Sequence, residues 1–120
     1  MAEEKRFENR IKKWLESQGI YRLGTPKQKM MVPQIGSYLK YWGGQFTING
    51  VPDMLIDIGG TIMYLELKAT KGRPSKVQEY IVNQINNYGG YAKIVYPQDW
   101  EDVRDDIKRV ISKAIKKQEE

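Results

Sequence analysis

The stretch from Gly50 to Lys68 constrains the fold most strongly, because it joins two strand-like runs through a pair of glycines. Residues 54–58 form a short apolar run, and residues 61–67 form a second run rich in β-branched and aromatic side chains. Gly59-Gly60 between them is typical of a tight turn, since glycine adopts positive φ without a Cβ clash. The sequence therefore predicts an antiparallel β-hairpin.

The two-residue loop also predicts the register of this hairpin. Ile58 would pair with Thr61, which places Asp53 opposite Glu66, with Cβ atoms about 4.5–5.5 Å apart. Strand alternation puts Glu66 and Lys68 on one face, about 6–7 Å apart. Two close carboxylates repel each other unless a cation lies between them, and oxygen ligands suit Mg²⁺ or Mn²⁺. The alternative is a charged network on a polar sheet face, although both carboxylates lie within apolar runs.

Composition excludes several classes of site. The 120 residues contain no His and no Cys, which excludes His-dependent nucleases, zinc sites built from His or Cys, and serine or cysteine triads. The length fits one domain, and the net charge of +5 mildly favours a polyanionic partner. No apolar run approaches the ~20 residues of a membrane span, and the charged N-terminus does not resemble a signal peptide. The lack of Cys fits a reducing cytoplasm.

Apolar periodicity predicts four elements around the hairpin: a helix over residues 3–18, a helix over 76–88, a strand over 91–96 and a helix over about 100–117. The strand–helix–strand crossover favours a parallel strand pair. We therefore expect an α/β fold in a single domain of residues 1–120, with a mixed sheet between helices and a core over about 3–97.

The segment after the hairpin is predicted to begin its helix with a capping box formed by Ser75 and Gln78. The inward stripe of this helix is expected to comprise Val77, Tyr80, Ile81, Gln84, Ile85 and Tyr88. The preceding loop carries Lys71, Arg73 and Lys76 next to a helix N-terminus, where free N–H groups favour phosphate. Such a loop is either simply solvated or a phosphate-binding segment.

Three features precede the hairpin. Glu8 lies at the edge of the first helix's apolar stripe, either as a site residue or as a surface partner of Lys12. Residues 22–39 are punctuated by Gly and Pro, which indicates a connecting loop or an insertion that contacts nucleic acid or a second subunit. Lys40 would share a strand face with Trp42. Its side chain either reaches the predicted carboxylate site or keeps the edge strand of the sheet from pairing with another chain.

Pro52-Asp53 and Glu66-Leu67-Lys68 carry a family resemblance. The pattern NGVPD, twelve residues, ELK and then KGRPSKVQ resembles the PD-(D/E)XK nuclease superfamily, in particular small stand-alone phage-type members of its VRR-NUC family. The run KYWGG at residues 40–44 also resembles an element of these relatives. The resemblance implies an αβββαβ core with one extra C-terminal helix.

The resemblance further implies an Mg²⁺- or Mn²⁺-dependent DNA endonuclease without a nucleotide cofactor, located in the host cytoplasm if phage-encoded. The implied catalytic residues are Asp53, Glu66, Lys68 and Gln78. The implied metal ligands are Glu8, Asp53, Glu66 and the Leu67 carbonyl, with Glu4 as the rival of Glu8. The expected DNA contacts are Lys40, Lys71, Arg73, Ser75 and Lys76.

Small stand-alone members of this family resemble Holliday-junction resolvases, so the resemblance implies branched DNA as the substrate. Symmetric incision of a junction needs two sites and each chain holds one, so a homodimer is implied if that is the substrate. A flap or nicking nuclease of the same fold, and a catalytically silent DNA-binding or assembly module, are the alternatives.

Overall fold

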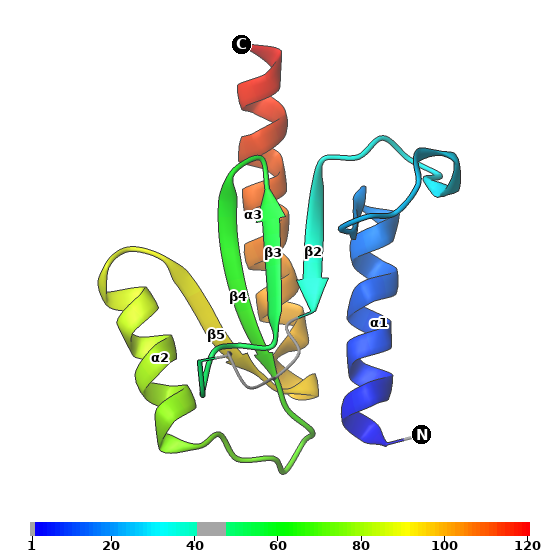
Figure 1. Ribbon diagram of the computed structural model, residues 1–120. Coiled ribbons are helices and arrows are strands. Elements are labelled where there is room, and N and C mark those ends of the chain that lie inside the picture. The colour runs from blue at the N-terminus through cyan, green and yellow to red at the C-terminus, as the bar shows by residue number, and fades with distance from the viewer. Residues whose placement is uncertain (1, 41–47) are drawn as a thin grey trace.

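The computed structural model describes residues 2–40 and 48–120, arranged as helices around one sheet (Figure 1). The helices are α1 (Glu3–Ser17), α2 (Lys76–Asn87) and α3 (Trp100–Glu119), with short 3₁₀ turns η1 (Lys27–Lys29) and η2 (Pro97–Asp99). The strands are β1 (Ile20–Arg22), β2 (Gly36–Lys40), β3 (Met54–Ile58), β4 (Thr61–Leu67) and β5 (Tyr91–Val95). The predicted positions of Tyr41, Trp42 and the Gly43-Gly44 pair lie outside the described residues.

In the described part of the chain the strands form one five-stranded mixed sheet in the order β1-β2-β3-β4-β5. The outer pairs β1–β2 and β4–β5 are parallel, and the inner pairs are antiparallel. The predicted hairpin register is confirmed, since Ile58 pairs with Thr61 and Met54 pairs with Leu65. Gly59 and Gly60 both have positive φ, as a tight turn between twisted strands requires.

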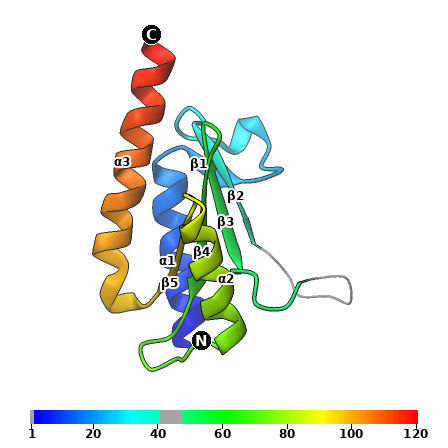
Figure 2. The same cartoon turned by 90° about the vertical axis from the view of Figure 1, so that its left-hand side faces the viewer.

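The sheet is covered on both faces, as expected. One face packs against α1 and α3 in the main core, which includes Ile11, Met54, Leu65 and Ile107. The other face carries a smaller cluster, in which Val82 and Ile85 of α2 pack on Ala92. The strands are seen side on in Figure 2, with α3 on one side of them. Alternate residues of each central strand therefore point toward α1 and α3 or toward α2.

Residues 20–40 are more regular in structure than their sequence indicates. β1 was not predicted, and in the described part of the chain four strands precede α2 where two or three were expected. The insertion is held by Tyr21, whose hydroxyl donates to the Val32 carbonyl at 2.8 Å and accepts from the Val32 amide at 3.0 Å. The Ile35 amide also donates to the Gly19 carbonyl at 2.8 Å. These long-range contacts fix the conformation of residues 22–39, which the positions of Gly and Pro in the sequence alone do not predict.

The predicted inward stripe of α2 is partly wrong. Val77, Tyr80, Gln84 and Tyr88 are exposed, whereas Ile81, Val82 and Ile85 pack toward the sheet. Together with the half-buried Gln78, these residues have the i, i+3, i+4, i+7 spacing of a helix face. The exposed Val77 and Tyr80 extend the apolar surface of the helix beyond this face, so the apolar pattern alone did not single out the side that docks on Ala92.

α3 begins at the predicted position and extends two residues beyond its expected end. Val103, Ile107 and Ile111 are buried, and Ile115 is exposed near the C-terminal end. Asp99 occupies the N-cap position, but its side chain makes no capping hydrogen bond, since the η2 turn leads directly into the helix. Among the described residues, no helix combines the length and apolarity that crossing a membrane demands.

Candidate active site

Asp53 and Glu66 meet where β3 begins and β4 ends. Asp53 lies one residue before Met54, the first paired residue of β3, so the confirmed register places it beside Glu66. The Asp53 backbone amide donates to Glu66 Oε1 at 3.2 Å, and the Leu67 amide approaches Asp53 Oδ1 at 3.5 Å. The two predicted carboxylates are therefore brought together by the hairpin.

Glu8 of α1 belongs to the same cluster. Its side chain is nearly buried, with 4% of the residue exposed. Lys40 joins it to Asp53, because the Lys40 ammonium lies 2.7 Å from Glu8 Oε1 and 2.8 Å from Asp53 Oδ2. Glu4 is exposed, so the first-helix glutamate that approaches Asp53 is Glu8.

The electrostatic environment of Glu8 strongly favours its charged form. Burial alone would raise its pKa, but hydrogen bonds from Lys12, Lys40 and Lys5 outweigh burial and lower the pKa of Glu8 to about 2. Lys12 and Lys5 lie 2.7 and 2.9 Å from Glu8 Oε2. The i, i+4 pairing with Lys12 was an alternative reading of this glutamate, and the structure shows that it coexists with the Lys40 contact.

Lys40 is expected at the site or at a strand edge, and the structure places it at the site. Its side chain is 11% exposed and lies on the α1 face of β2 together with Tyr38. Burial lowers the pKa of Lys40, but hydrogen bonds to Asp53 and Glu8 more than compensate, so its pKa is raised. The ammonium is thus engaged by two carboxylates, and its predicted DNA contact stays a prediction.

Glu66 has the opposite environment. It is 6% exposed, and its strand position matches that of Tyr64, which packs on the α2 side of the sheet. Burial, followed by repulsion from Asp53, raises the pKa of Glu66 to about 7, and attraction to Lys68 offsets only part of this. The Lys68 ammonium lies 3.7 Å from Glu66 Oε2, and the Lys68 amide donates to the Val95 carbonyl at 2.9 Å. The pair Glu66 and Lys68 therefore lies together as predicted.

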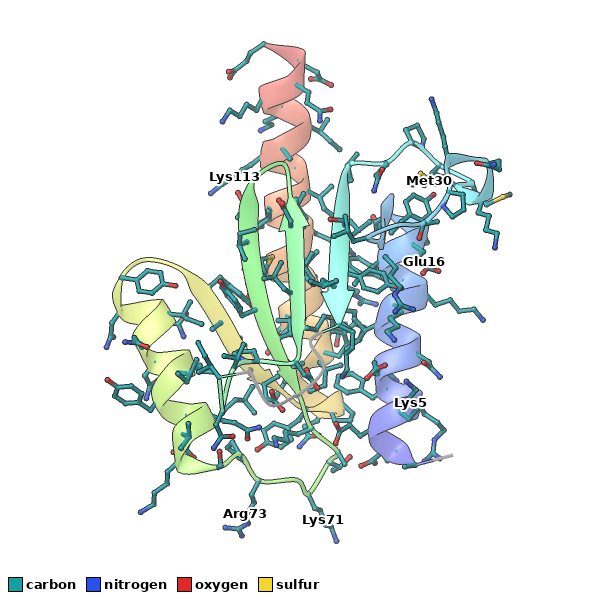
Figure 3. All side chains as sticks on the ribbon, in the orientation of Figure 1. Lys5, Glu16, Met30, Lys71, Arg73 and Lys113 are labelled. Atoms are coloured by element: carbon teal, nitrogen blue, oxygen red, sulfur yellow. The ribbon has the colours of Figure 1, made fainter. Side chains whose placement is uncertain are left out.

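The loop between β4 and α2 brings its basic residues to the surface. Lys71 and Arg73 project away from the molecule at the lower end of the loop (Figure 3). Glu3 holds this loop, because its carboxylate accepts hydrogen bonds from the Thr70 amide at 2.6 Å and the Thr70 hydroxyl at 2.8 Å. The sequence analysis did not identify this tether, since no local spacing links Glu3 to a residue 67 positions away.

The predicted capping box at the start of α2 is confirmed. The Ser75 hydroxyl accepts a hydrogen bond from the backbone amide of Gln78 at 3.1 Å, and the side-chain oxygen Oε1 of Gln78 accepts one from the backbone amide of Ser75 at 2.9 Å. Both side chains therefore have a structural role at the helix terminus. The catalytic role of Gln78 and the DNA contacts of Ser75 and Lys76 stay predictions.

The donor chemistry of the cluster fits a hard divalent cation. Its acidic side chains supply carboxylate oxygens, which Mg²⁺ and Mn²⁺ prefer, and the Lys40 ammonium already places a positive charge between Glu8 and Asp53. Among residues 2–40 and 48–120, no three acidic side chains are grouped closely enough to form a metal cluster by themselves. Mg²⁺ commonly uses one or two carboxylates with water and substrate phosphates, so Asp53 and Glu66 are a sufficient protein contribution.

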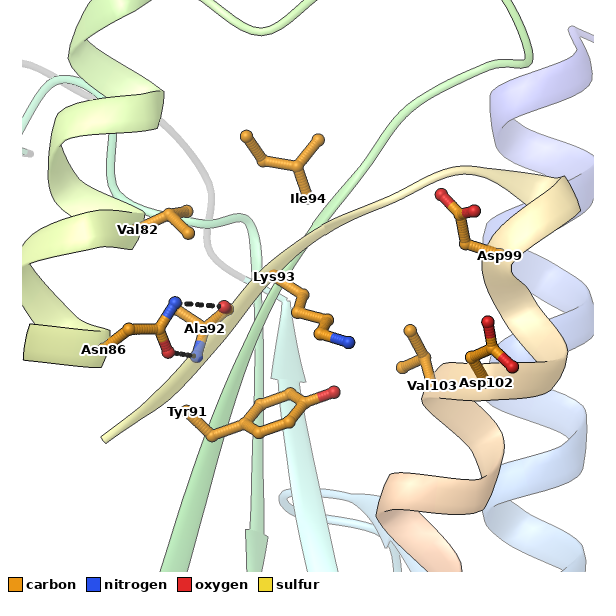
Figure 4. Close-up of a pocket in the computed structure, with 9 residues that line it drawn as sticks. All are labelled: Val82, Asn86, Tyr91, Ala92, Lys93, Ile94, Asp99, Asp102 and Val103. Atoms are coloured by element: carbon orange, nitrogen blue, oxygen red, sulfur yellow. Dashed lines mark hydrogen bonds between the residues drawn. The ribbon is translucent and has the colours of Figure 1, made fainter. Parts of the chain in front are cut away.

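A hollow of about 550 Å³ lies elsewhere, between α2, β5 and the start of α3 (Figure 4). Asn86 lies at its wall, and the Asn86 amide group exchanges two hydrogen bonds with the Ala92 backbone, at 2.8 and 2.9 Å. The lining residues include none of the predicted site residues. This hollow is therefore separate from the Asp53–Glu66 cluster.

Comparison with protein-family models gives no match, and searches of curated proteins and of solved structures find no similar protein.

Proposed function

We propose that this chain is an Mg²⁺- or Mn²⁺-dependent endodeoxyribonuclease built on a PD-(D/E)XK-type core. The observation that carries the proposal is the meeting of Asp53 and Glu66 on paired strands, with the Lys68 ammonium 3.7 Å from Glu66. Glu8 joins the cluster from α1 through Lys40. The order of helix, antiparallel hairpin, helix and parallel strand supports this choice of core.

Each residue of the cluster has a role in this proposal. Asp53 and Glu66 would hold the cation, with Glu8 and the Leu67 carbonyl as further ligands implied by the family resemblance. When bound, a divalent cation lowers the pKa of a water molecule and neutralises charge on a phosphodiester. Lys68 would orient the attacking water or stabilise the negative charge that develops on the phosphoryl oxygens. Burial of Glu66 strengthens each of these electrostatic interactions, because the local dielectric is low.

The finer proposal concerns the substrate. We infer a preference for branched DNA, with Holliday-junction resolution by a homodimer, since symmetric incision needs two sites and each chain supplies one. A cytoplasmic location, that of the host cell if a phage encodes the chain, stays a prediction from the absence of Cys.

The test is a cleavage assay with labelled four-way junction, flap and linear duplex DNA, each with Mn²⁺, with Mg²⁺ and with EDTA. The variant is Lys68→Ala. The matched control is Lys93→Ala, because Lys93 also lies on the sheet but pairs with Asp106 at 3.5 Å, outside the cluster.

We expect metal-dependent cuts that Lys68→Ala removes and Lys93→Ala retains. Paired symmetric cuts in the junction would support the dimeric resolvase. Cuts confined to flap or linear DNA would support the proposed nuclease function and reject the proposed preference for junctions. Tight DNA binding without any cut, in either metal, would reject the nuclease.

A further inference from the structure

A groove of about 500 Å³ runs along the outer face of α1, beside β2. Four cationic side chains line it, namely Arg6, Arg10, Lys12 and Lys13, together with Asn9. One carboxylate, Glu16, lines the end near β2, and it accepts a hydrogen bond from the Tyr38 hydroxyl at 2.8 Å. The groove is therefore strongly positive along most of its length.

The cations lie in a row along the helix. Arg6, Arg10 and Lys13 have the i, i+4, i+7 spacing of one face, which extends over about 10 Å at 1.5 Å per residue. A row of this length can therefore face a short run of consecutive phosphates of one DNA strand. Arg10 is held on the surface, with its guanidinium 5.4 Å from the Phe7 ring centroid.

The groove is linked to the candidate active site by a chain of ion pairs. Lys12 lines the groove and also lies 2.7 Å from Glu8 Oε2. Glu8 in turn contacts Lys40, which contacts Asp53. On the other side of the cluster, the loop that carries Lys71 and Arg73 is tied to the N-terminus of α1 by Glu3 and Thr70.

The side chains of the groove favour one kind of anionic ligand, a nucleic-acid strand, over a membrane surface. It exposes guanidinium, ammonium and amide groups, and among the described residues that line it Tyr38 is the one aromatic residue and is buried. A helix that lies on a membrane needs an exposed apolar face, whereas the opposite face of α1 is buried in the core through Phe7, Ile11 and Leu15. Regularly spaced phosphates of a nucleic-acid strand fit such a row of cations best.

The geometry points to a strand path: the α1 groove binds the sugar–phosphate backbone of the DNA and leads it to the Asp53–Glu66 cluster. This inference rests on the proposed nuclease function and adds the surface that positions the substrate. Arg10 and Lys13 are its main contacts, since both are exposed and neither belongs to the cluster.

The test measures binding of wild type and variants to a fluorescent four-way junction and a linear duplex in EDTA, by anisotropy over a salt series. The groove variant is Arg10→Gln with Lys13→Gln. The matched control is Lys113→Gln with Lys116→Gln, which removes the same charge from the exposed side of α3 (Figure 3). A third variant, Arg10→Lys with Lys13→Arg, keeps both charges in the groove.

We expect the groove variant to bind DNA at least about tenfold more weakly than wild type. The slope of its log binding constant against log salt concentration should fall in magnitude by about 2, because two phosphate contacts are lost. The control and the charge-conserving variant should bind within about twofold of wild type. Equal binding by the groove variant and the control would overturn the strand path while leaving the nuclease intact. No binding of DNA by the wild type would instead overturn the proposed function itself.

Discussion

Glu8 and Glu66 are both buried glutamates of one cluster, yet their environments shift the pKa in opposite directions. Glu8 accepts contacts from Lys5, Lys12 and Lys40 at 2.7–2.9 Å, and its pKa is lowered to about 2. Glu66 is desolvated and faces Asp53, with one lysine at 3.7 Å, and its pKa is raised to about 7. The difference shows that burial alone does not determine charge, since the number and distance of the cations do.

The comparison indicates where the proposed cation would bind. On the α1 side of the cluster, lysines already neutralise Glu8. On the α2 side, Asp53 and Glu66 share insufficient positive charge, and a divalent cation would relieve their repulsion. This imbalance supports placing the cation between Asp53 and Glu66, with Lys40 holding Asp53 from the other side.

The largest expected effect concerns activity. Asp53→Asn and Glu66→Gln should each lower cleavage at least about a thousandfold, because the cation supplies several kcal/mol of transition-state stabilisation. Asp57→Asn is the matched control, since Asp57 lies at the opposite end of the same hairpin and accepts a hydrogen bond from the turn amide of Gly60. Cleavage rates under single-turnover conditions measure this. Wild-type rates in either site variant would reject the assignment of the cation to this pair.

The next effect tests Lys40, the lysine that links Glu8 to Asp53. Lys40→Met should lower the free energy of unfolding in EDTA by about 3 kcal/mol, since it removes the lysine partner of Asp53 and one of the three lysines around the buried Glu8. Lys93→Met, which removes a lysine that is 47% exposed, should cost under about 1 kcal/mol. Urea denaturation of both variants gives the comparison.

Added Mn²⁺ should restore much of the stability that Lys40→Met loses, because a cation that binds the folded state stabilises it. A Lys40→Met variant no less stable than Lys93→Met would show that Lys40 does not hold the cluster together.

A matched pair of substitutions should have opposite signs. At pH 7.5 in EDTA, Glu8→Gln should destabilise the fold by about 3 kcal/mol and Glu66→Gln should stabilise it by about 2 kcal/mol, as their opposite pKa shifts require. Glutamine keeps the shape of both side chains, removes the charge and replaces one acceptor oxygen with an N–H donor group. Chemical denaturation of the two variants against wild type measures both values, and equal signs would contradict the comparison.

The two glutamates should also act in different pH windows. The folded-state pKa of Glu8 is lowered from 4.5 to about 2, so its stabilisation is present above pH 4.5 and is lost as pH falls toward 2. The folded-state pKa of Glu66 is raised from 4.5 to about 7, so stability falls as pH rises from 4.5 through 7. Glu66→Gln should remove the fall in stability between pH 4.5 and 7 and leave unchanged the fall below pH 4.5 that is due to Glu8. Chemical denaturation across pH 2–8 would show both.

The hairpin was predictable from sequence because its information is local. Gly59-Gly60 fixes the loop length, the loop length fixes the register, and the register brings Asp53 to Glu66. The lysine contact of Glu8 at i, i+4 is also local. For such residues, the distance along the chain translates directly into distance in space.

Other parts of the site depend on tertiary packing. Strand alternation gives the face of Lys40 but not its two carboxylate partners, which lie 32 and 13 residues away. The tether between Glu3 and Thr70 and the buried face of α2 arise from docking of helices on the sheet. The opposite pKa shifts of Glu8 and Glu66 likewise depend on the number of surrounding cations, which only the folded chain provides.

The smallest expected effect concerns Gln78, whose helix covers the Glu66 face of the sheet. Gln78→Ala should lower stability by about 1 kcal/mol through loss of the capping box. Gln78→Glu should keep stability within about 0.5 kcal/mol, because a glutamate at this position accepts the same Ser75 amide and favours the helix N-terminus.

The predicted catalytic role separates these two variants. If the amide of Gln78 donates a hydrogen bond to the reacting groups, Gln78→Glu should slow cleavage about tenfold at unchanged stability, since a lost hydrogen bond to a charged group is worth roughly 1.5–3 kcal/mol. Melting temperatures and single-turnover rates of the same samples measure both effects. An unchanged rate in the stable Gln78→Glu variant would assign Gln78 to capping alone and confine catalysis to the residues around Glu66.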